Sequence, residues 1–145
     1  MLGNNEGDLT IIGIAGIGTV IIEIERIEKA VQRSGDRFLK RVFTASERSF
    51  CDSRRDRFAC YAARFAAKEA VLKAMGTGLT GSHWTDIEIS RKDENGPLVL
   101  LHGATAVLAA EKGIIRMLLS ISHDRGRSLA FAVAVREGGV KTCGL

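Results

Sequence analysis

The sequence predicts an α+β fold in which an antiparallel sheet packs against one long helix. Apolar residues at helical spacing run through 56–75, and Gly76 follows them as a stop signal. Two late segments, 116–122 and 128–135, alternate apolar and polar residues on either side of a short turn, as the strands of a hairpin do. At 145 residues the chain suits a single domain, which we expect to span residues 10–137.

Local signals define the other elements in order. Residues 10–17 are rich in isoleucine, which favours a buried strand, and their glycines allow close backbone approach. An amphipathic helix over 23–34 ends at Gly35. Thr44-Ala-Ser-Glu47 matches a capping box and begins a short helix through Cys51. The remaining predicted elements are strands at 84–91 and 97–101 around a turn at 93–96, a helix over 105–112, and flexible tails at 1–9 and 138–145.

Composition and charge narrow the class of protein. Hydrophobic residues make up 46% of the chain, which is ordinary for a soluble globular protein, and the net charge of +4 favours acidic partners. Basic residues are densest between Arg48 and Arg64, but one Trp and one Tyr make nucleic-acid recognition a weak case. No apolar run approaches the roughly 20 residues that span a bilayer, so we expect no membrane partner. Three cysteines without metal-site spacing favour a reducing cytoplasm.

The long helix carries charge on its apolar side. Glu69 falls at nearly the same azimuth as Phe58 and Phe65, and Lys68 and Lys73 flank that stripe. A carboxylate in this position must be desolvated, paired or bound to a metal, because an isolated buried charge is strongly unfavourable. The simpler alternative is an ion pair between Glu69 and Lys73 at i,i+4 on a solvated face.

Three further motifs each allow a structural and a chemical interpretation. Gly76-Thr-Gly78 is either a helix C-cap with its turn or backbone left open to a ligand. His123, at a strand end, is either structural or a contact to a phosphate or hydroxyl. Asp124 beside it suggests a Ser-His-Asp hydrolase, which we reject because no Gly-x-Ser-x-Gly motif is present. Gly16-Ile-Gly18 is a weak dinucleotide signal, since the third glycine and a parallel βαβ unit are absent.

Four segments together resemble the holo-acyl carrier protein synthase family in order and spacing, over about residues 10–135. They are 14–27 (IAGIGTVIIEIERI), 64–78 (RFAAKEAVLKAMGTG), 84–89 (WTDIEI) and 119–123 (LSISH). The resemblance implies the 4′-phosphopantetheinyl transferase fold and a magnesium-dependent enzyme of fatty acid biosynthesis. Such an enzyme moves the 4′-phosphopantetheine arm of coenzyme A onto a serine of apo-acyl carrier protein and releases 3′,5′-adenosine diphosphate. It also implies a homotrimer with active sites at the subunit interfaces.

The same resemblance implies roles for individual residues. The implied catalytic residues are Glu69, as a magnesium ligand that also helps to deprotonate the serine through water, and Lys73, which contacts the phosphates or assists proton transfer. Candidates for binding coenzyme A are Arg64 and Lys68 at the nucleotide phosphates, Gly76 and Gly78 through their backbone, and His123 at the diphosphate. Candidates for binding the acidic carrier protein are Arg26, Arg48 and Arg54.

One position departs from the family pattern. The family reads Gly-Ile-Gly-Thr-Asp with that aspartate as a metal ligand, whereas this chain has Val20, and valine cannot coordinate magnesium. Glu23 and Glu25 follow closely but point elsewhere if a helix begins there. We therefore expect a transferase with weakened metal binding. The alternatives are a non-catalytic homologue that binds coenzyme A or the carrier protein without turnover and, more distantly, a basic nucleic-acid-binding protein.

Overall fold

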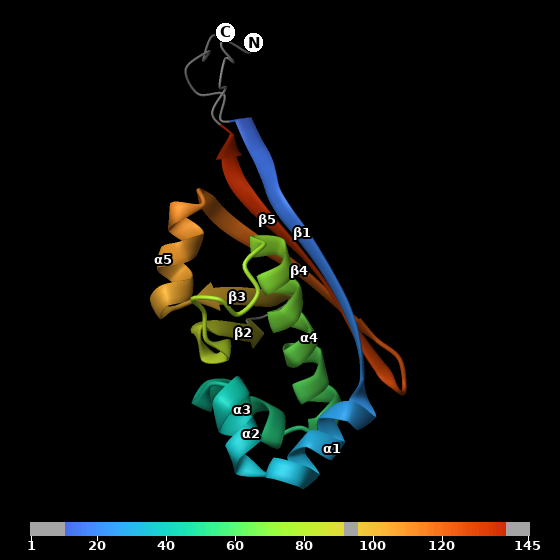
Figure 1. The fold of residues 1–145 in the computed structure, drawn as a ribbon. Coiled ribbons are helices and arrows are strands. Elements are labelled where there is room, and N and C mark those ends of the chain that lie inside the picture. The colour runs from blue at the N-terminus through green and yellow to red at the C-terminus, as the bar shows by residue number, and fades with distance from the viewer. Residues whose placement is uncertain (1–10, 92–95, 139–145) are drawn as a thin grey trace, which may run out of the picture.

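A long helix lies along one face of a three-stranded antiparallel sheet (Figure 1). The computed structural model describes residues 11–91 and 96–138. The expected fold class, an antiparallel sheet packed against a long helix, is confirmed. The helix is α4 (Arg57–Met75), and the strands, in spatial order, are β1 (Ile11–Glu23), β5 (Arg127–Gly138) and β4 (Ile114–His123).

The remaining elements surround α4. Three short helices follow one another around its N-terminal end, and a two-stranded sheet packs beside it (Figure 1). The helices are α1 (Ile24–Ser34), α2 (Asp36–Val42) and α3 (Ala45–Asp52), the small sheet is β2 (Ile87–Arg91) with β3 (Pro97–Leu101), and α5 (Gly103–Glu111) contacts β4. Within the described ranges, no helix is both long enough and apolar enough to cross a bilayer.

Two expectations about the first half of the chain need correction. Helix α2 is not predicted by the sequence, because Gly35 indicates only the end of the preceding helix. Its φ of 56° ends α1 and begins α2 at the same residue, and Leu39 and Val42 then enter the core. The first strand is longer than predicted, reaching Glu23, and only one of its faces is buried.

Smaller differences lie at element ends. Residues Trp84–Asp86 form a 3₁₀ turn, so β2 begins at Ile87, and the last hairpin extends two or three residues beyond its predicted outer ends. Gly138 belongs to β5, whereas it was assigned to a tail. The expected tails at 1–9 and 139–145 and most of the turn at 93–96 lie outside the described residues.

Small residues bring α4 unusually close to the sheet. A Cβ atom added at Gly16 would lie 2.1 Å from the carbonyl oxygen of Ala74, and one added at Gly18 would lie 2.1 Å from that of Ala70. Strand β5 contributes Ala130, Ala132 and Ala134, all fully buried, beside them. Gly16 and Gly18 of β1 therefore serve helix–strand packing, which agrees with the close backbone approach expected there.

A Gly18→Ala variant should lose about 1–3 kcal/mol of unfolding free energy, because the added methyl group overpacks this contact. Since the obstructing atom is backbone oxygen, α4 itself must move. Gly13→Ala is the matched control, because a Cβ there meets only the Arg136 side chain at 3.6 Å. Urea denaturation of both variants measures the difference, and equal stabilities would contradict the close packing.

Candidate active site

Glu69 and Lys73 lie on the side of α4 next to β1, but they do not form the i,i+4 ion pair considered above. The Glu69 side chain is half-buried and makes no hydrogen bond or ion pair with any residue the structure describes. Lys73 is exposed, and its Nζ donates to the carbonyl oxygen of Thr19 at 3.3 Å. An unpaired carboxylate one helical turn from a lysine can receive a cation or a proton from a ligand.

Val20 occupies the inward side of β1, two residues after Gly18, which packs against Ala70 and Lys73 of α4. Gly16 faces Ala74 and Gly18 faces Ala70, so two residues along β1 correspond to one turn back along α4. By the same spacing, Val20 is expected to face the turn 66–69, which ends at Glu69. The Val20 side chain is 7% exposed and belongs to the core. It therefore fills with hydrocarbon the inward position of β1 at which the family pattern described above has an aspartate.

Neither nearby glutamate takes the place of a second carboxylate. Glu23 is exposed at the end of β1 and, by strand alternation, points to the opposite face from Val20. Glu25 pairs with Lys29 at 3.2 Å on the exposed face of α1. Across the described residues no cluster of three His, Cys, Asp or Glu side chains could hold a metal. Of the three glutamates considered, Glu69 is thus the one left free, within the described part of the chain, to anchor a cation.

A basic pocket of about 990 Å³ lies where the α3–α4 connection meets β2 and the β4–β5 turn. Arg64 and His123, both expected at a phosphate site, line it together. Arg54, expected at the carrier protein, lines it as well, together with its neighbour Arg55. Two further cations were missed, Arg91 at the end of β2 and Arg125 in the β4–β5 turn. Their only sequence signals are the position after a strand and the neighbourhood of His123.

Arg64 is the most enclosed of these cations, with 7% of its surface exposed. Its guanidinium carbon lies 4.4 Å from the centre of the Phe50 ring, and Nη1 donates to the sulfur of Cys60 at 3.1 Å. Its Nε is buried without a hydrogen-bond partner. A buried guanidinium with an unused donor, held beside a basic pocket, is suited to binding an anion.

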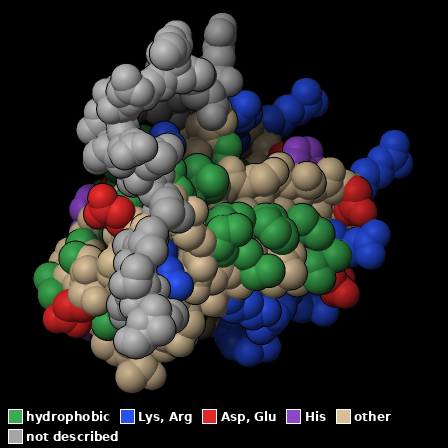
Figure 2. All heavy atoms as spheres, turned by 90° about the horizontal axis from the view of Figure 1, so that it is seen from above, with side chains coloured by type: hydrophobic (Ala, Val, Ile, Leu, Met, Phe, Trp, Pro, Cys, Tyr) green, Lys and Arg blue, Asp and Glu red, His purple; other side chains and the backbone are tan. Residues whose placement is uncertain are grey.

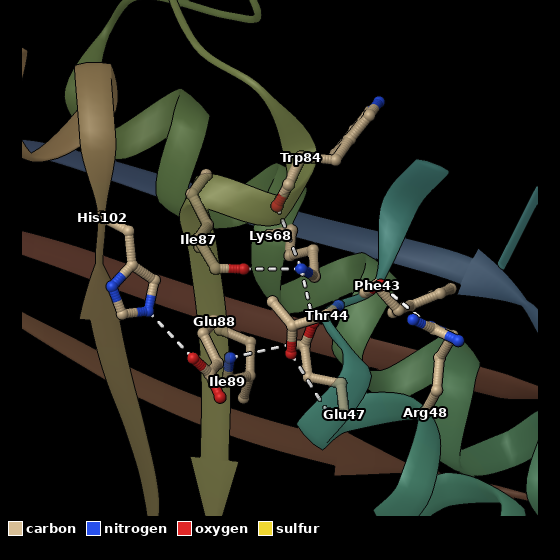
Figure 3. A network of polar contacts seen from close by, with 10 residues as sticks. All are labelled: Phe43, Thr44, Glu47, Arg48, Lys68, Trp84, Ile87, Glu88, Ile89 and His102. Atoms are coloured by element: carbon tan, nitrogen blue, oxygen red, sulfur yellow. Dashed lines mark hydrogen bonds and ion pairs between the residues drawn. The ribbon is translucent and has the colours of Figure 1, made fainter. Parts of the chain in front are cut away.

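Lys68 does not lie at a phosphate site, contrary to expectation (Figure 3). It is fully buried, and its three donors contact Glu47 Oε1 at 2.7 Å and the carbonyl oxygens of Trp84 and Ile87 at 3.0 and 2.5 Å. Burial lowers the pKa of Lys68, and the Glu47 carboxylate opposes this by favouring the charged form. An ammonium group has three N–H donors, so none remains for a ligand.

Glu47 completes this buried network. Oε1 also accepts from the Thr44 backbone at 2.9 Å, as the predicted capping box requires, and Oε2 accepts from the backbone of Ile89 at 2.9 Å (Figure 3). One carboxylate therefore joins the start of α3, the middle of α4 and strand β2. The charged residues that α4 buries are Arg64 and Lys68 rather than Glu69.

The other predicted site residues are scattered. Arg26 is exposed on α1, far along the chain from the pocket residues, and Arg48 Nε donates to the Phe43 carbonyl oxygen at 3.3 Å. Gly76 caps α4 with φ 76°, and Gly78 has φ 56° with no atom within 4 Å of an added Cβ. The C-cap interpretation of this segment is therefore correct, and its backbone is also uncovered.

Asp124 has a structural role in the β4–β5 turn. Its carboxylate accepts from the backbone of Gly126 and Arg127 and pairs with Arg127 Nη2 at 2.9 Å. The hydrogen bond from Arg127 lowers the pKa of Asp124. These contacts agree with the rejection of a Ser-His-Asp hydrolase, since this carboxylate holds its own turn.

Comparisons with known proteins point in one direction. The family model of the 4′-phosphopantetheinyl transferase superfamily matches residues 16–134. A holo-[acyl-carrier-protein] synthase from Desulforudis audaxviator is 50% identical over 122 residues, which cover 84% of this chain and 93% of the relative. The crystal structure of a holo-[acyl-carrier-protein] synthase from Neisseria meningitidis superposes with a TM-score of 0.80 at 35% identity, covering 84% of this chain and 98% of that one.

A second solved structure carries a ligand. The Helicobacter pylori holo-[acyl-carrier-protein] synthase in complex with coenzyme A superposes with a TM-score of 0.72 at 35% identity. The match covers 81% of this chain and 98% of that chain. The similarity therefore extends over the α4 and β-sheet framework that carries Glu69, Lys73 and the basic pocket.

Proposed function

This chain belongs to the holo-acyl carrier protein synthase family of the 4′-phosphopantetheinyl transferase superfamily, and from that membership we propose how its two candidate regions act on coenzyme A. The basic pocket binds the phosphates at the nucleotide end of coenzyme A. Glu69 and Lys73 act where the 4′-phosphopantetheine arm passes to a serine of apo-acyl carrier protein. The observation that carries the proposal is the pocket itself, in which five arginines and His123 line one cavity.

The reaction is a phosphoryl-group transfer. The carrier serine oxygen forms a bond to the phosphorus that carries the pantetheine arm, and the bond from that phosphorus to 3′,5′-adenosine diphosphate breaks. Glu69 accepts the serine proton through a water molecule, and Lys73 contacts the phosphate oxygens on which charge develops. These roles require an unpaired carboxylate and an exposed lysine, which is how the two side chains lie.

Magnesium fits this donor set only in part. Mg²⁺ on phosphate ligands is usually held by about one or two protein carboxylates, with waters and phosphate oxygens as the remaining ligands. Glu69 would be its protein ligand here, and the bound ion would neutralise the diphosphate. Because Val20 supplies no oxygen, we propose that metal binding and activity are weaker than an aspartate at this position would allow.

The two regions belong to opposite sides of α4. Cys60 lines the pocket and Glu69 is nine residues further on, which separates them by roughly 180° at 100° per residue. We therefore propose that the pocket of one subunit completes a site with Glu69 of a neighbour.

The outer face of the large sheet suits such an assembly. Side chains from all three strands leave it apolar and exposed, and Figure 2 shows hydrophobic side chains gathered on this part of the surface. They are Ile17, Ile21, Leu118, Leu129 and Phe131. An exposed apolar patch of this kind marks a contact surface, and we propose a homotrimer. Light scattering coupled to gel filtration tests it, and a monomer would contradict it.

A transfer assay with mixed subunits tests the proposal. The protein is incubated with apo-carrier, coenzyme A and Mg²⁺, and the carrier is weighed for gain of the arm. Glu69→Gln and Arg64→Gln variants are each expected to be inactive. Refolded together, random trimers should regain about a quarter of the wild-type sites, because one interface type combines both intact residues. No gain with wild-type protein overturns the enzyme, and no recovery on mixing overturns the shared site.

A Val20→Asp variant is expected to raise the transfer rate by at least about tenfold at limiting Mg²⁺, because a second carboxylate joins Glu69 at the cation. Without metal the same variant should be less stable, since an unpaired carboxylate replaces a core valine. Val20→Asn is the control for side-chain shape. Activity titrated against Mg²⁺ measures the effect.

The non-catalytic alternative rests on Val20. If neither the wild-type chain nor Val20→Asp modifies the carrier while both bind coenzyme A, the protein is a binding homologue. A gain of activity in Val20→Asp favours a weakened enzyme. We place the reaction in the cytoplasm, where it supplies holo-carrier protein for fatty acid synthesis.

A further inference from the structure

Two cysteines meet at the junction of α3 and α4. Cys51 is fully buried near the end of α3, and Cys60 lies in the first turns of α4, half-exposed in the wall of the basic pocket. Their sulfur atoms lie 2.6 Å apart, and the Cys51 thiol donates to Cys60. A covalent bond between sulfurs measures about 2.05 Å, so only a small movement separates this pair from a disulfide.

The surroundings of Cys60 favour its thiolate. The hydrogen bond from Cys51 lowers the pKa of the Cys60 thiol to about 7, and the charges of Arg64, Arg54 and Arg91 act in the same direction against the effect of burial. The same hydrogen bond and burial raise the pKa of Cys51. A partly exposed thiolate next to guanidinium groups is the reactive form of cysteine, and Cys51 is placed as a resolving thiol.

We propose that Cys51 and Cys60 form a reversible dithiol–disulfide pair that is oxidised by peroxides and alters the basic pocket. The Cys60 thiolate attacks a peroxide oxygen, so that an S–O bond forms, the O–O bond breaks and hydroxide leaves. That hydroxide takes the proton of Cys51 and becomes water. The Cys51 thiolate then attacks the sulfur of the Cys60 sulfenic acid, so that the S–S bond forms, the S–O bond breaks and a second hydroxide leaves, which takes up from solvent the proton that Cys60 lost on ionising. Two electrons pass from the thiols to the peroxide, and a dithiol reductant reverses the change.

The pair is coupled to the pocket through Arg64. In the reduced protein Nη1 of Arg64 donates to the Cys60 sulfur at 3.1 Å, while Nε has no partner. A disulfide sulfur is neutral and a weaker acceptor, so oxidation frees the guanidinium for an anion. A bound phosphate, in turn, competes with Cys60 for Arg64 and covers the thiol. This coupling, unlike the pair itself, rests on the proposed nucleotide pocket.

The experiment measures thiols in the full chain with Cys143→Ser as background, which leaves the two cysteines of the junction. After hydrogen peroxide, the protein should lose both free thiols, show an internal disulfide by peptide mass spectrometry, and recover both thiols with dithiothreitol. Cys51→Ser should instead accumulate a sulfenic acid at residue 60, trapped by dimedone. Persistence of both thiols in the oxidised sample, or faster alkylation of Cys51 than of Cys60, overturns the proposal.

Adding 3′,5′-adenosine diphosphate tests the coupling without using the transfer reaction. The nucleotide should slow oxidation of Cys60 by at least about tenfold if it holds Arg64 and lowers the thiolate fraction. Disulfide formation that the nucleotide leaves unchanged supports the cysteine pair and counts against the pocket as the nucleotide site. A chain that modifies the carrier protein but forms no disulfide supports the proposed transferase and overturns the cysteine pair. Circular dichroism of Cys51→Ser shows whether a loss of reactivity comes from a loss of fold. Counting the free thiols of the wild-type chain before and after peroxide tests the disulfide without any change at position 51 or 60.

Discussion

Lys68→Met is expected to lower the free energy of unfolding by about 3–5 kcal/mol, because it leaves the Glu47 carboxylate buried without its counter-ion. Both side chains are at most 1% exposed. The two carbonyl oxygens that accept from Lys68 would also lose their charged donor. Urea denaturation followed by circular dichroism measures the change. An unfolding transition at lower urea concentration is the expected result of the unpaired Glu47 carboxylate.

Two further variants make this prediction specific. In Glu47→Met/Lys68→Met the charges are removed together, so the double variant should be more stable than Lys68→Met alone. Lys29→Met removes one member of the exposed Glu25–Lys29 pair, whose side chains are 67% and 66% exposed, and should change stability by less than about 0.5 kcal/mol. Equal losses in the single and double variants would show that packing, not charge pairing, sets the cost.

The buried ion pair also explains which part of the site could not be predicted. Helical periodicity assumes that a helix has one buried face, but α4 is covered by both sheets and by the short helices on almost every side. The angular position around the helix axis therefore does not predict that Lys68 is buried and that Glu69 is partly exposed. The capping box correctly placed Glu47 at the start of α3. Its contacts with Lys68 and Ile89 depend on tertiary packing across residues far apart in the chain.

The framework was more predictable than the cavity, for a physical reason. Alternating strands, the Gly76 stop and the hairpin at 124–127 are local signals, and each defines its element here. The pocket joins the α3–α4 connection, the end of β2 and the β4–β5 turn. Arg64 and His123 could be assigned through their motifs, whereas Arg91 and Arg125 reach the pocket only because the fold brings these ends together.

The proposed chemistry depends most on Glu69, whose replacement should affect rate far more than stability. Glu69→Gln is expected to lower carrier modification by at least about 10²–10³-fold, because the amide neither accepts the serine proton nor carries the charge that anchors a cation. Since the Glu69 carboxylate has no partner among the described side chains, no contact is broken in the folded state. The melting temperature should therefore stay close to that of the wild type.

The control and the rescue distinguish a catalytic role for Glu69 from a local disturbance. Glu111→Gln changes an exposed glutamate on α5 and should leave the rate unchanged. In Glu69→Gln, 3′,5′-adenosine diphosphate should still slow the oxidation of Cys60, because the pocket residues are intact. Adding Val20→Asp to Glu69→Gln returns one carboxylate to the cation but no base at position 69, so recovery should be partial and should require Mg²⁺. A Glu69→Gln protein that modifies the carrier at the wild-type rate would remove Glu69 from the mechanism.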